Sequence, residues 1–533
     1  MGAFSRRRCL AVAGLAAVLA VGSLSPAAAS TGARCDAALV GLLEHVTVVD
    51  LQVAMGARRL SSEQVTRGYL RRIDQLNPRL NAVVRVNPDA VAMARRSDAH
   101  RRAHGARGPL EGIPVLLKEN MNTADRQQTT AGSTALLGAK PAADAFLVSR
   151  LRAAGAVVLG KANLSEWSNF RGSNLPDGRS AVGGQTRNPY VLDRSPSGSS
   201  SGSAVSAAAG LAAVAIGTDT DGSVVYPASA TSTVGIRPTL GLVSRGGIVP
   251  ITSRHDTPGP IARTVTDAAL TLWAIQGVDP ADPDTAVAAG TLPGDPRTVL
   301  RRDALRGKRI GLWREGHTGV DADVDRVFDA AVRRLRDLGA TVVEGADVPD
   351  IQDVTTAHML PAVLTEFKHD LNAYLAATPG SHPRDLRELI EYYERHPDGF
   401  DHLLFDMANG TDGDLTAPAY RAHREAATGA ARRAIDDLLA RHRLDAIVTP
   451  TSLPAPVIGR ERDSAPFAKT TTHAAAGGYP HITVPAGYST NGLPLGLSFI
   501  GTRFSDARLI GFAYAFEQAT NTRQTPRYLP TTH

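Results

Sequence analysis

The sequence predicts an α/β fold in which a β-sheet is covered by helices on both faces. Three observations predict it: short apolar runs of strand length recur along the chain, helical stretches separate them, and residues 307–345 hold a strand–helix–strand pattern. Strands that alternate with helices are typical of sheets buried on both faces. With 533 residues the chain is long enough to bury a large core.

Helices open the predicted order of elements. A helical pattern begins at Asp50, and Ser61 with Gln64 forms a capping box before a second helix, which we expect to stop before Pro78. A third helix is expected over residues 88–103. The N-terminal part of the domain is therefore expected to be helical.

Apolar runs and helices then alternate. Residues 204–213 suit a buried helix, because alanine has a high helix propensity. Residues 346–440 are polar and helical. Strand-like apolar runs stand at residues 114–117, 156–159, 214–217, 309–313 and 341–344, and apolar blocks return at 445–450 and 481–487.

Composition is that of an ordinary globular protein, with 43% hydrophobic and 21% charged residues. Arg6, Arg7 and Arg8 supply three of the charges behind the formal net charge of +6, and no Lys/Arg run of the nucleic-acid-binding type occurs elsewhere. We therefore expect no nucleic-acid partner. Zinc-type Cys/His spacing and the His-Glu-x-x-His motif are both missing from the sequence, so we expect no metal.

Residues 1–29 have the features of an export signal. The arginines at 6–8 form a twin-arginine pattern, residues 11–24 are apolar but short for a membrane span, and Ala27–Ala29 offers a cleavage site. We expect a twin-arginine type signal peptide over 1–29, and a secreted or extracytoplasmic mature domain over 30–533 without a stable membrane anchor. A buried helix and a retained anchor stay open as alternatives.

Two turns rich in serine and glycine, residues 195–203 and 217–223, flank a buried apolar run. Such turns can bring two serines together, and Lys118 lies upstream in an apolar stretch that would favour its uncharged form. A serine hydroxyl both accepts and donates, so it can relay a proton to a lysine base. The pattern indicates acyl transfer by a serine nucleophile.

The order of these motifs resembles the amidase signature family. The resemblance covers roughly 45–275 and 440–520, and the matching segments are 112–120, 129–133, 160–167, 188–190, 195–203, 217–223, 235–239, 256–260 and 492–497. It implies an amidase domain over 30–533 with a large mixed β-sheet covered by helices on both faces. It also implies a variable helical insertion at about 295–440.

The resemblance implies a role for each matching residue. Ser223 matches the nucleophile, and Lys118 matches the base. Ser199, which the family's spacing to Ser223 selects from the serine run, matches a bridging serine held in a cis peptide. The family's oxyanion hole, built from backbone N–H groups, matches Thr220, Asp221, Gly222 and Ser223.

Three departures from the family's usual motifs occur near this site. Asp221 replaces the first glycine of the common Gly-Gly-Ser, and an acidic side chain beside an oxyanion is unfavourable unless it points away. Val225 replaces a frequent arginine, while Ser197 and Ser201 replace glycines. The aspartate at position 221 makes this motif similar to that of the peptide amidase branch, whose members remove the C-terminal amide of peptides.

Glu166 and Trp167, with residues 256–260, add to this likeness and are candidate substrate-binding residues. We therefore expect a secreted amidase that converts an amide to an acid and ammonia through a Ser-Ser-Lys triad without a cofactor. An amidated peptide is the sharper substrate prediction, and broad activity on small amides is the alternative.

Other functions fit the sequence less well. Residues 198–202 satisfy the Gly-x-Ser-x-Gly nucleophile elbow of α/β-hydrolases, with Ser200 as nucleophile, but no good strand precedes them. A glutamine amidotransferase subunit shares the amidase core but works with protein and tRNA partners, which an exported protein does not meet. A non-catalytic binding protein would not need all three catalytic residue types.

Overall fold

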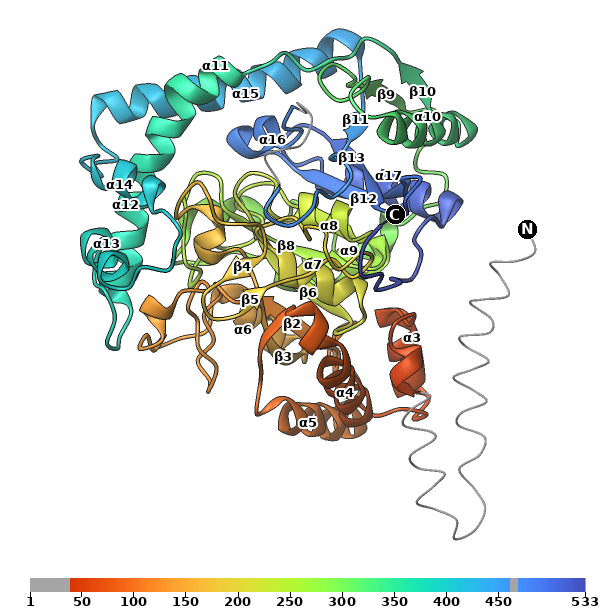
Figure 1. Cartoon of the computed structure of the whole chain (residues 1–533). Coiled ribbons are helices and arrows are strands. Elements are labelled where there is room, and N and C mark those ends of the chain that lie inside the picture. The colour runs from red at the N-terminus through yellow and green to blue at the C-terminus, as the bar shows by residue number, and fades with distance from the viewer. Residues whose placement is uncertain (1–38, 461–467, 533) are drawn as a thin grey trace.

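A computed structural model describes residues 39–460 and 468–532, and an eleven-stranded sheet runs through its middle (Figure 1). The strand order is β1-β3-β2-β6-β8-β7-β12-β13-β11-β9-β10. The strands are β1 (Val83–Val86), β2 (Pro114–Lys118), β3 (Val157–Ala162), β6 (Val214–Asp219), β7 (Val234–Arg237), β8 (Thr257–Ala262), β9 (Arg309–Leu312), β10 (Thr341–Val343), β11 (Ala446–Pro450), β12 (His481–Tyr488) and β13 (Pro494–Ile500). A separate two-stranded sheet pairs β4 (Arg179–Ser180) with β5 (Gly184–Gln185).

The large sheet is mixed, as predicted. β3, β2 and β6 are parallel neighbours, as are β11, β9 and β10, while β8, β7, β12 and β13 pair antiparallel between these two groups. Because β2 and β6 are parallel, their carboxyl ends meet at one edge of the sheet. Lys118 ends β2 and Asp219 ends β6, so this edge is where the predicted site residues gather.

Helices cover both faces of the sheet. Ile261 of β8 packs with Ala204 and Ala228, whereas its neighbour Ala262 packs in the main core with Val265. Successive strand residues point to opposite faces, so these contacts define two layers. The helices are α3 (Val48–Gly56), α4 (Ser62–Leu80), α5 (Ala90–His104), α6 (Phe146–Ala153), α7 (Ser201–Ala208), α8 (Val225–Ala230), α9 (Val265–Ile275), α10 (Ala322–Asp337), α11 (Gln352–Val354), α12 (Leu360–Ala377), α13 (Leu386–Arg395), α14 (Leu403–Asn409), α15 (Pro418–His442), α16 (Thr472–Gly477) and α17 (Asp506–Thr520).

Short helical turns lie between these helices and strands in the described part of the chain. Four are 3₁₀ turns, at Thr134–Leu136, Glu166–Asn169, Pro283–Ala288 and Pro296–Thr298. A π-helical turn, Thr355–Met359, joins α11 to α12.

Helix boundaries at the N-terminal end differ from the prediction in two places. The Ser61–Gln64 capping box is confirmed, with Gln64 N–H donating to Ser61 Oγ at 3.1 Å. Asp50, however, lies in the first turn of α3 and closes a second capping box with Thr47. The predicted stop before Pro78 is wrong, because α4 continues through the proline to Leu80.

The continuation past Pro78 has a local cause. A proline has no backbone N–H and so removes one helical hydrogen bond. Pro78 lies in the last turn of α4, so the lost bond affects only the end of the helix. Asn81 then ends the helix in the left-handed conformation, at φ 47, and its N–H donates to the Asn77 carbonyl at 2.8 Å. The Asn77 side chain also accepts from the N–H groups of Ala82 and Val83 at 2.8 Å each, which fixes the turn into β1.

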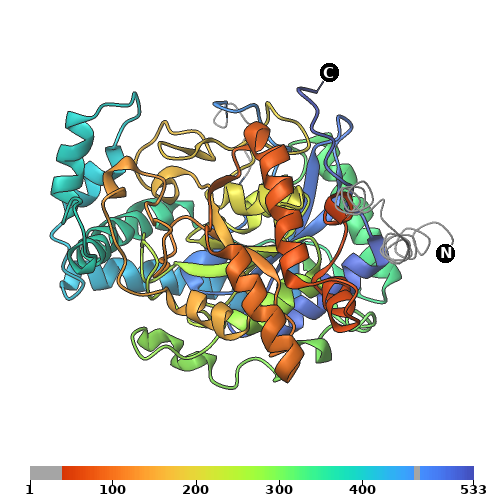
Figure 2. The same ribbon diagram turned by 90° about the horizontal axis from the view of Figure 1, so that it is seen from below.

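The structure divides the segment for which a helical insertion at about 295–440 was predicted. Its first part supplies β9, α10 and β10 to the sheet, and only residues from α11 onward form a helical lobe. Figures 1 and 2 show α12, α13 and α14 in blue-green at one side of the molecule, away from the red and orange α3–α5. Phe367, Leu389 and Phe405 of this lobe share an apolar cluster with Trp167 and Leu136 of the core.

The described residues contain no helix that is both long enough and apolar enough to cross a membrane. Residues 1–29, where the sequence predicts an export signal, lie outside the described residues.

Candidate active site

Lys118 ends the buried strand β2, and its side chain is fully enclosed. Its Nζ donates to Ser199 Oγ at 2.7 Å and to Thr218 Oγ1 at 2.8 Å. Burial lowers the pKa of Lys118 to about 7, although the carboxylates of Asp219 and Asp256 oppose this shift. A neutral amine, which can accept a proton, is therefore accessible near neutral pH.

Ser199 is also fully buried and lies two residues before α7. The Gly198–Ser199 peptide bond is cis. Gly198 has no room for a side chain, since a Cβ there would lie 2.4 Å from Ser165 Oγ and 2.7 Å from Asp177 Oδ1. The structure thus places Ser199 in direct contact with Lys118.

Ser223 lies just before α8 and, unlike Lys118 and Ser199, is partly exposed. Its carbonyl accepts from the Ser200 N–H at 3.2 Å, which joins the two serine-rich turns. Only Ser223 among the three predicted residues is therefore accessible from outside.

Ser200 is held differently. It is fully buried, its Oγ donates to the Thr218 carbonyl at 3.0 Å, and the Thr218 N–H donates back to it at 3.2 Å. A nucleophile elbow requires an exposed serine hydroxyl, so the alternative with Ser200 as nucleophile does not fit this structure.

The loop before Ser223 is organised around Asp219. Its Oδ1 accepts from the Gly222 N–H at 2.9 Å and from Arg237 Nη1 at 2.7 Å, and its Oδ2 accepts from the Val224 N–H at 2.7 Å. The Gly222 N–H is therefore already used, which removes it from the predicted oxyanion donors. The N–H groups of Thr220, Asp221 and Ser223 donate to no group in the described part of the chain.

Thr220 is fixed from the opposite side of this loop. Its Oγ1 donates to Asp256 Oδ1 at 2.6 Å, while Asp256 Oδ2 accepts from the N–H groups of Ile251 at 2.7 Å and Thr252 at 3.1 Å. Burial raises the pKa of Asp256 to about 6, against the effect of these hydrogen bonds. The 256–260 motif thus supports the loop.

Asp221, which the sequence marked as a departure, has its carboxylate held by side chains between residues 469 and 472. Oδ1 accepts from Thr471 Oγ1 at 2.5 Å, Oδ2 accepts from Thr472 Oγ1 at 2.9 Å, and Lys469 Nζ lies 3.5 Å from Oδ2. Burial disfavours the anion, but Lys469 and the two hydroxyls outweigh it and lower the pKa of Asp221.

Comparison with known proteins agrees with this geometry. A model of the amidase family matches residues 64–510. The chain belongs to the amidase family. It is 41% identical over 539 residues to a probable amidase of Arabidopsis thaliana, covering 99% of this chain and 98% of that protein. The predicted hydrolase class is thereby confirmed.

Solved structures confirm the amidase signature fold. Peptide amidase from Stenotrophomonas maltophilia is 46% identical, with a TM-score of 0.85 over 91% of this chain and 99% of that chain. An amidase family protein from Bacillus anthracis is 32% identical, with a TM-score of 0.83 over 97% of each chain.

Glu166 and Trp167 of this amidase do not form an open substrate surface. Glu166 is 1% exposed, and its Oε1 accepts from Tyr393 OH at 2.5 Å and from Arg171 Nη1 at 3.1 Å. Trp167 is 2% exposed, and its Nε1 donates to Tyr393 OH at 2.7 Å. Both residues make packing contacts that attach the helical lobe to the core, and their part in substrate binding stays a prediction.

Sequence reasoning missed the partners of these residues. Tyr393 and Arg171 gave no signal, because Tyr393 lies far away in a polar helical stretch. Thr218 and Asp219 lie inside the matching motif 217–223, so the sequence did carry a signal for them.

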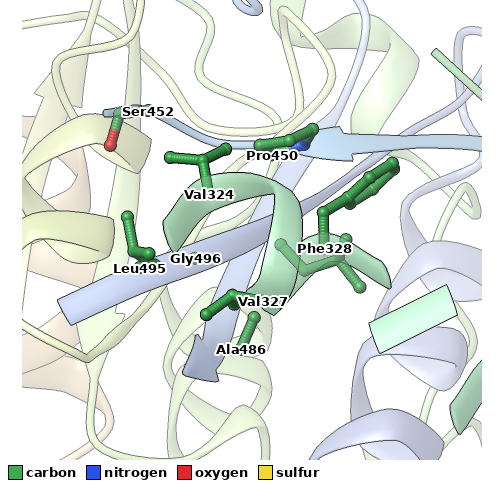
Figure 3. Close-up of a pocket in the computed structure, with 9 residues that line it drawn as sticks. Val324, Val327, Phe328, Pro450, Ser452, Ala486, Leu495 and Gly496 are labelled. Atoms are coloured by element: carbon green, nitrogen blue, oxygen red, sulfur yellow. The ribbon is translucent and has the colours of Figure 1, made fainter. Parts of the chain in front are cut away.

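Two hollows of the amidase lie away from this site. One is a small apolar cavity between α10 and the neighbouring strands (Figure 3), lined by Val324, Val327, Phe328, Pro450, Ala486 and Leu495. The other is a polar groove between residues 134–138 and α13. Neither is lined by Lys118, Ser199 or Ser223.

Proposed function

We propose that this amidase hydrolyses the C-terminal amide of peptides to the free acid and ammonia, with Ser223 as nucleophile, Ser199 as proton relay and Lys118 as base. The observation that carries the proposal is the contact of the enclosed Lys118 Nζ with Ser199 Oγ at 2.7 Å. The partly exposed Ser223 lies on the neighbouring turn, whose Ser223 carbonyl accepts from the Ser200 N–H. A buried amine with a pKa near 7 has the protonation equilibrium that a base needs at neutral pH.

Acylation begins as Ser223 Oγ bonds to the amide carbonyl carbon. The Ser223 proton passes to Ser199 Oγ, and the Ser199 proton passes to neutral Lys118. The carbonyl electron pair moves onto oxygen, and the free N–H groups of Thr220, Asp221 and Ser223 are in the loop that would hold this oxyanion. The C–N bond then breaks as Ser199 protonates the leaving nitrogen and Lys118 reprotonates Ser199.

Deacylation uses the same path with water in place of Ser223. Water attacks the acyl carbon and gives its proton through Ser199 to Lys118. As the new tetrahedral species collapses, the proton returns to Ser223 Oγ and the acid leaves. Lys118 ends each half-reaction neutral, so no cofactor enters the balance.

The peptide amide is favoured by the 46% identity to peptide amidase from Stenotrophomonas maltophilia. A peptide amidase of the same identity to this chain has a crystal structure in complex with the competitive inhibitor chymostatin. Asp221 in the motif adds to this likeness. Activity on small amides is the alternative, because the site's described residues do not by themselves select the acyl group.

Mass spectrometry of one peptide, in its C-terminally amidated form and as the free acid, tests the proposal. We expect conversion of the amide to the acid without internal cleavage, and no change in the free acid. The Ser223→Ala variant is the control and should leave both peptides intact. Turnover of acetamide together with an unchanged amidated peptide would contradict the peptide specificity and favour the small-amide alternative.

We also propose that residues 1–29 export the protein by the twin-arginine route, on the basis of Arg6, Arg7 and Arg8 followed by an apolar stretch. Fractionation of cells that produce the full chain should find it outside the cytoplasm, with a new N-terminus near Ser30. Replacing the three arginines by lysine should retain it inside. Equal export of both forms would contradict the twin-arginine route.

A further inference from the structure

We infer that Lys469 is the counter-ion of a carboxylate that this amidase carries inside its oxyanion loop, and that it acts on the reaction through Asp221. Lys469 is thus a positioning residue that acts on the reaction through its charge beside Asp221. The inference rests on the proposed role of Ser223 and the N–H groups beside it.

The contact between the two residues spans distant parts of the chain. Asp221 lies two residues before Ser223, and Thr471 and Thr472 hold its carboxylate at 2.5 and 2.9 Å. Lys469 Nζ is 3.5 Å from Oδ2, with the Asp221 side chain 17% exposed and the lysine 67% exposed. In the described part of the chain, no other lysine or arginine forms an ion pair with Asp221.

A negative charge at this position opposes the reaction. The carbonyl oxygen gains negative charge as Ser223 attacks, and a nearby carboxylate repels it, most strongly where water is excluded. Hydrogen bonds from Thr471 and Thr472 disperse the charge on Asp221 but do not cancel it. Lys469 supplies the opposite charge, so the pair presents little net charge to the oxyanion.

A second reading of the same contact is that Lys469 touches the substrate directly. The two readings differ in how they depend on Asp221. If Lys469 only compensates Asp221, its removal matters little once Asp221 is neutral. If it binds substrate, its removal costs the same with or without the carboxylate.

A double-mutant cycle separates them. The variants are Lys469→Ala, Asp221→Asn and both together, and the readout is the rate at which an aliphatic fluorophosphonate labels Ser223, since this reagent also generates a developing oxyanion but needs no peptide. We expect Lys469→Ala to slow labelling about tenfold. In the Asp221→Asn background the same change should slow it less than about twofold.

Two further variants control the experiment. Lys469→Arg keeps the charge and should restore labelling to near the wild-type rate. Lys308→Ala removes another exposed lysine, whose Nζ lies 3.6 Å from Asp445 at the far edge of the sheet, and should label like wild type. Thermal unfolding of each variant identifies any general loss of fold.

Three results would overturn the inference: an unchanged rate in Lys469→Ala, an equal loss in both backgrounds, or no rescue by Lys469→Arg. Labelled wild-type enzyme that leaves amidated peptides intact would contradict the peptide specificity alone. Folded wild-type enzyme that is not labelled at Ser223 would overturn the nucleophile and this inference together.

Discussion

At the scale of single residues, three consecutive positions of the loop from Asp219 to Ser223 are each held by hydrogen bonds. Thr220 is bound to Asp256, Asp221 to Thr471 and Thr472, and the Gly222 N–H to Asp219. Such over-determination holds N–H groups in place before the reaction begins, which is the condition for efficient stabilisation of developing charge.

Gly222 shows how little freedom this loop has. Its φ is +96, and a Cβ there would lie 2.5 Å from the Tyr226 ring. We expect backbone strain in Gly222→Ala to lower the free energy of unfolding by about 1–3 kcal/mol. We also expect a fall in kcat that is larger than any change in KM. Urea unfolding and steady-state kinetics measure both effects. A variant with wild-type stability and kcat would contradict the strained geometry.

The Thr220 hydroxyl gives a second prediction at this scale. Thr220→Val removes the donor to Asp256 while keeping the shape, so the loop loses one anchor. We expect kcat to fall about tenfold with KM nearly unchanged, and Thr220→Ser to restore it, because serine keeps the hydroxyl. Equal activity of the valine and serine variants would show that the hydrogen bond does not position the loop.

At the scale of elements, three pieces of the chain converge on the site: the end of β2, the turn before α7, and the turn between β6 and α8. The parallel pairing of β2 with β6 brings Lys118 beside Thr218. The helical lobe is attached to the core beside these pieces through Tyr393, which bonds to Glu166, Trp167 and Ser133.

Tyr393 therefore tests whether the lobe is attached by this network. Tyr393→Phe leaves the buried Trp167 Nε1 without its partner and removes one donor from Glu166, so we expect a loss of about 1–3 kcal/mol in the free energy of unfolding. Tyr392→Phe is the matched control, since its hydroxyl bonds only to the exposed Thr134 and should cost little. Equal stability of the two variants would contradict the role given to the network.

The same pair of variants distinguishes packing from substrate binding. KM measured well below the unfolding temperature should be unchanged in Tyr393→Phe if Glu166 and Trp167, which are both buried, act only in packing. A large rise in KM at full stability would return them to the substrate site.

At the scale of the whole molecule, the sequence predicted the features for which it holds a recognisable motif or an apolar stretch. The apolar stretch around Lys118 predicted its burial, and the resemblance to the amidase signature family implied the mixed sheet and the cis bond before Ser199. Residues from distant segments were not predictable. Tyr393 and Lys469 meet Trp167 and Asp221 only because the folded chain brings these segments together, and no local periodicity encodes such contacts.

Two features of the structure were not predicted, for identifiable physical reasons. Glu166 and Trp167 lie in a motif that matches the family, but their burial depends on a lobe whose packing against the core no local pattern encodes. The stop at Pro78 followed the usual rule for proline, whereas Asn77 and Asn81 provide a local exit that tolerates it.

The pH dependence of kcat/KM, compared between the wild type and Lys118→Ala, tests the central claim most directly. A lysine with a pKa near 7 is protonated in acid and then cannot accept the Ser199 proton. We predict that wild-type activity rises with pH through a midpoint near 7, and that Lys118→Ala loses at least about a thousandfold of kcat/KM together with this rise. Undiminished hydrolysis by folded Lys118→Ala, or the same midpoint in both proteins, would contradict the proton path from Ser223 through Ser199 to Lys118.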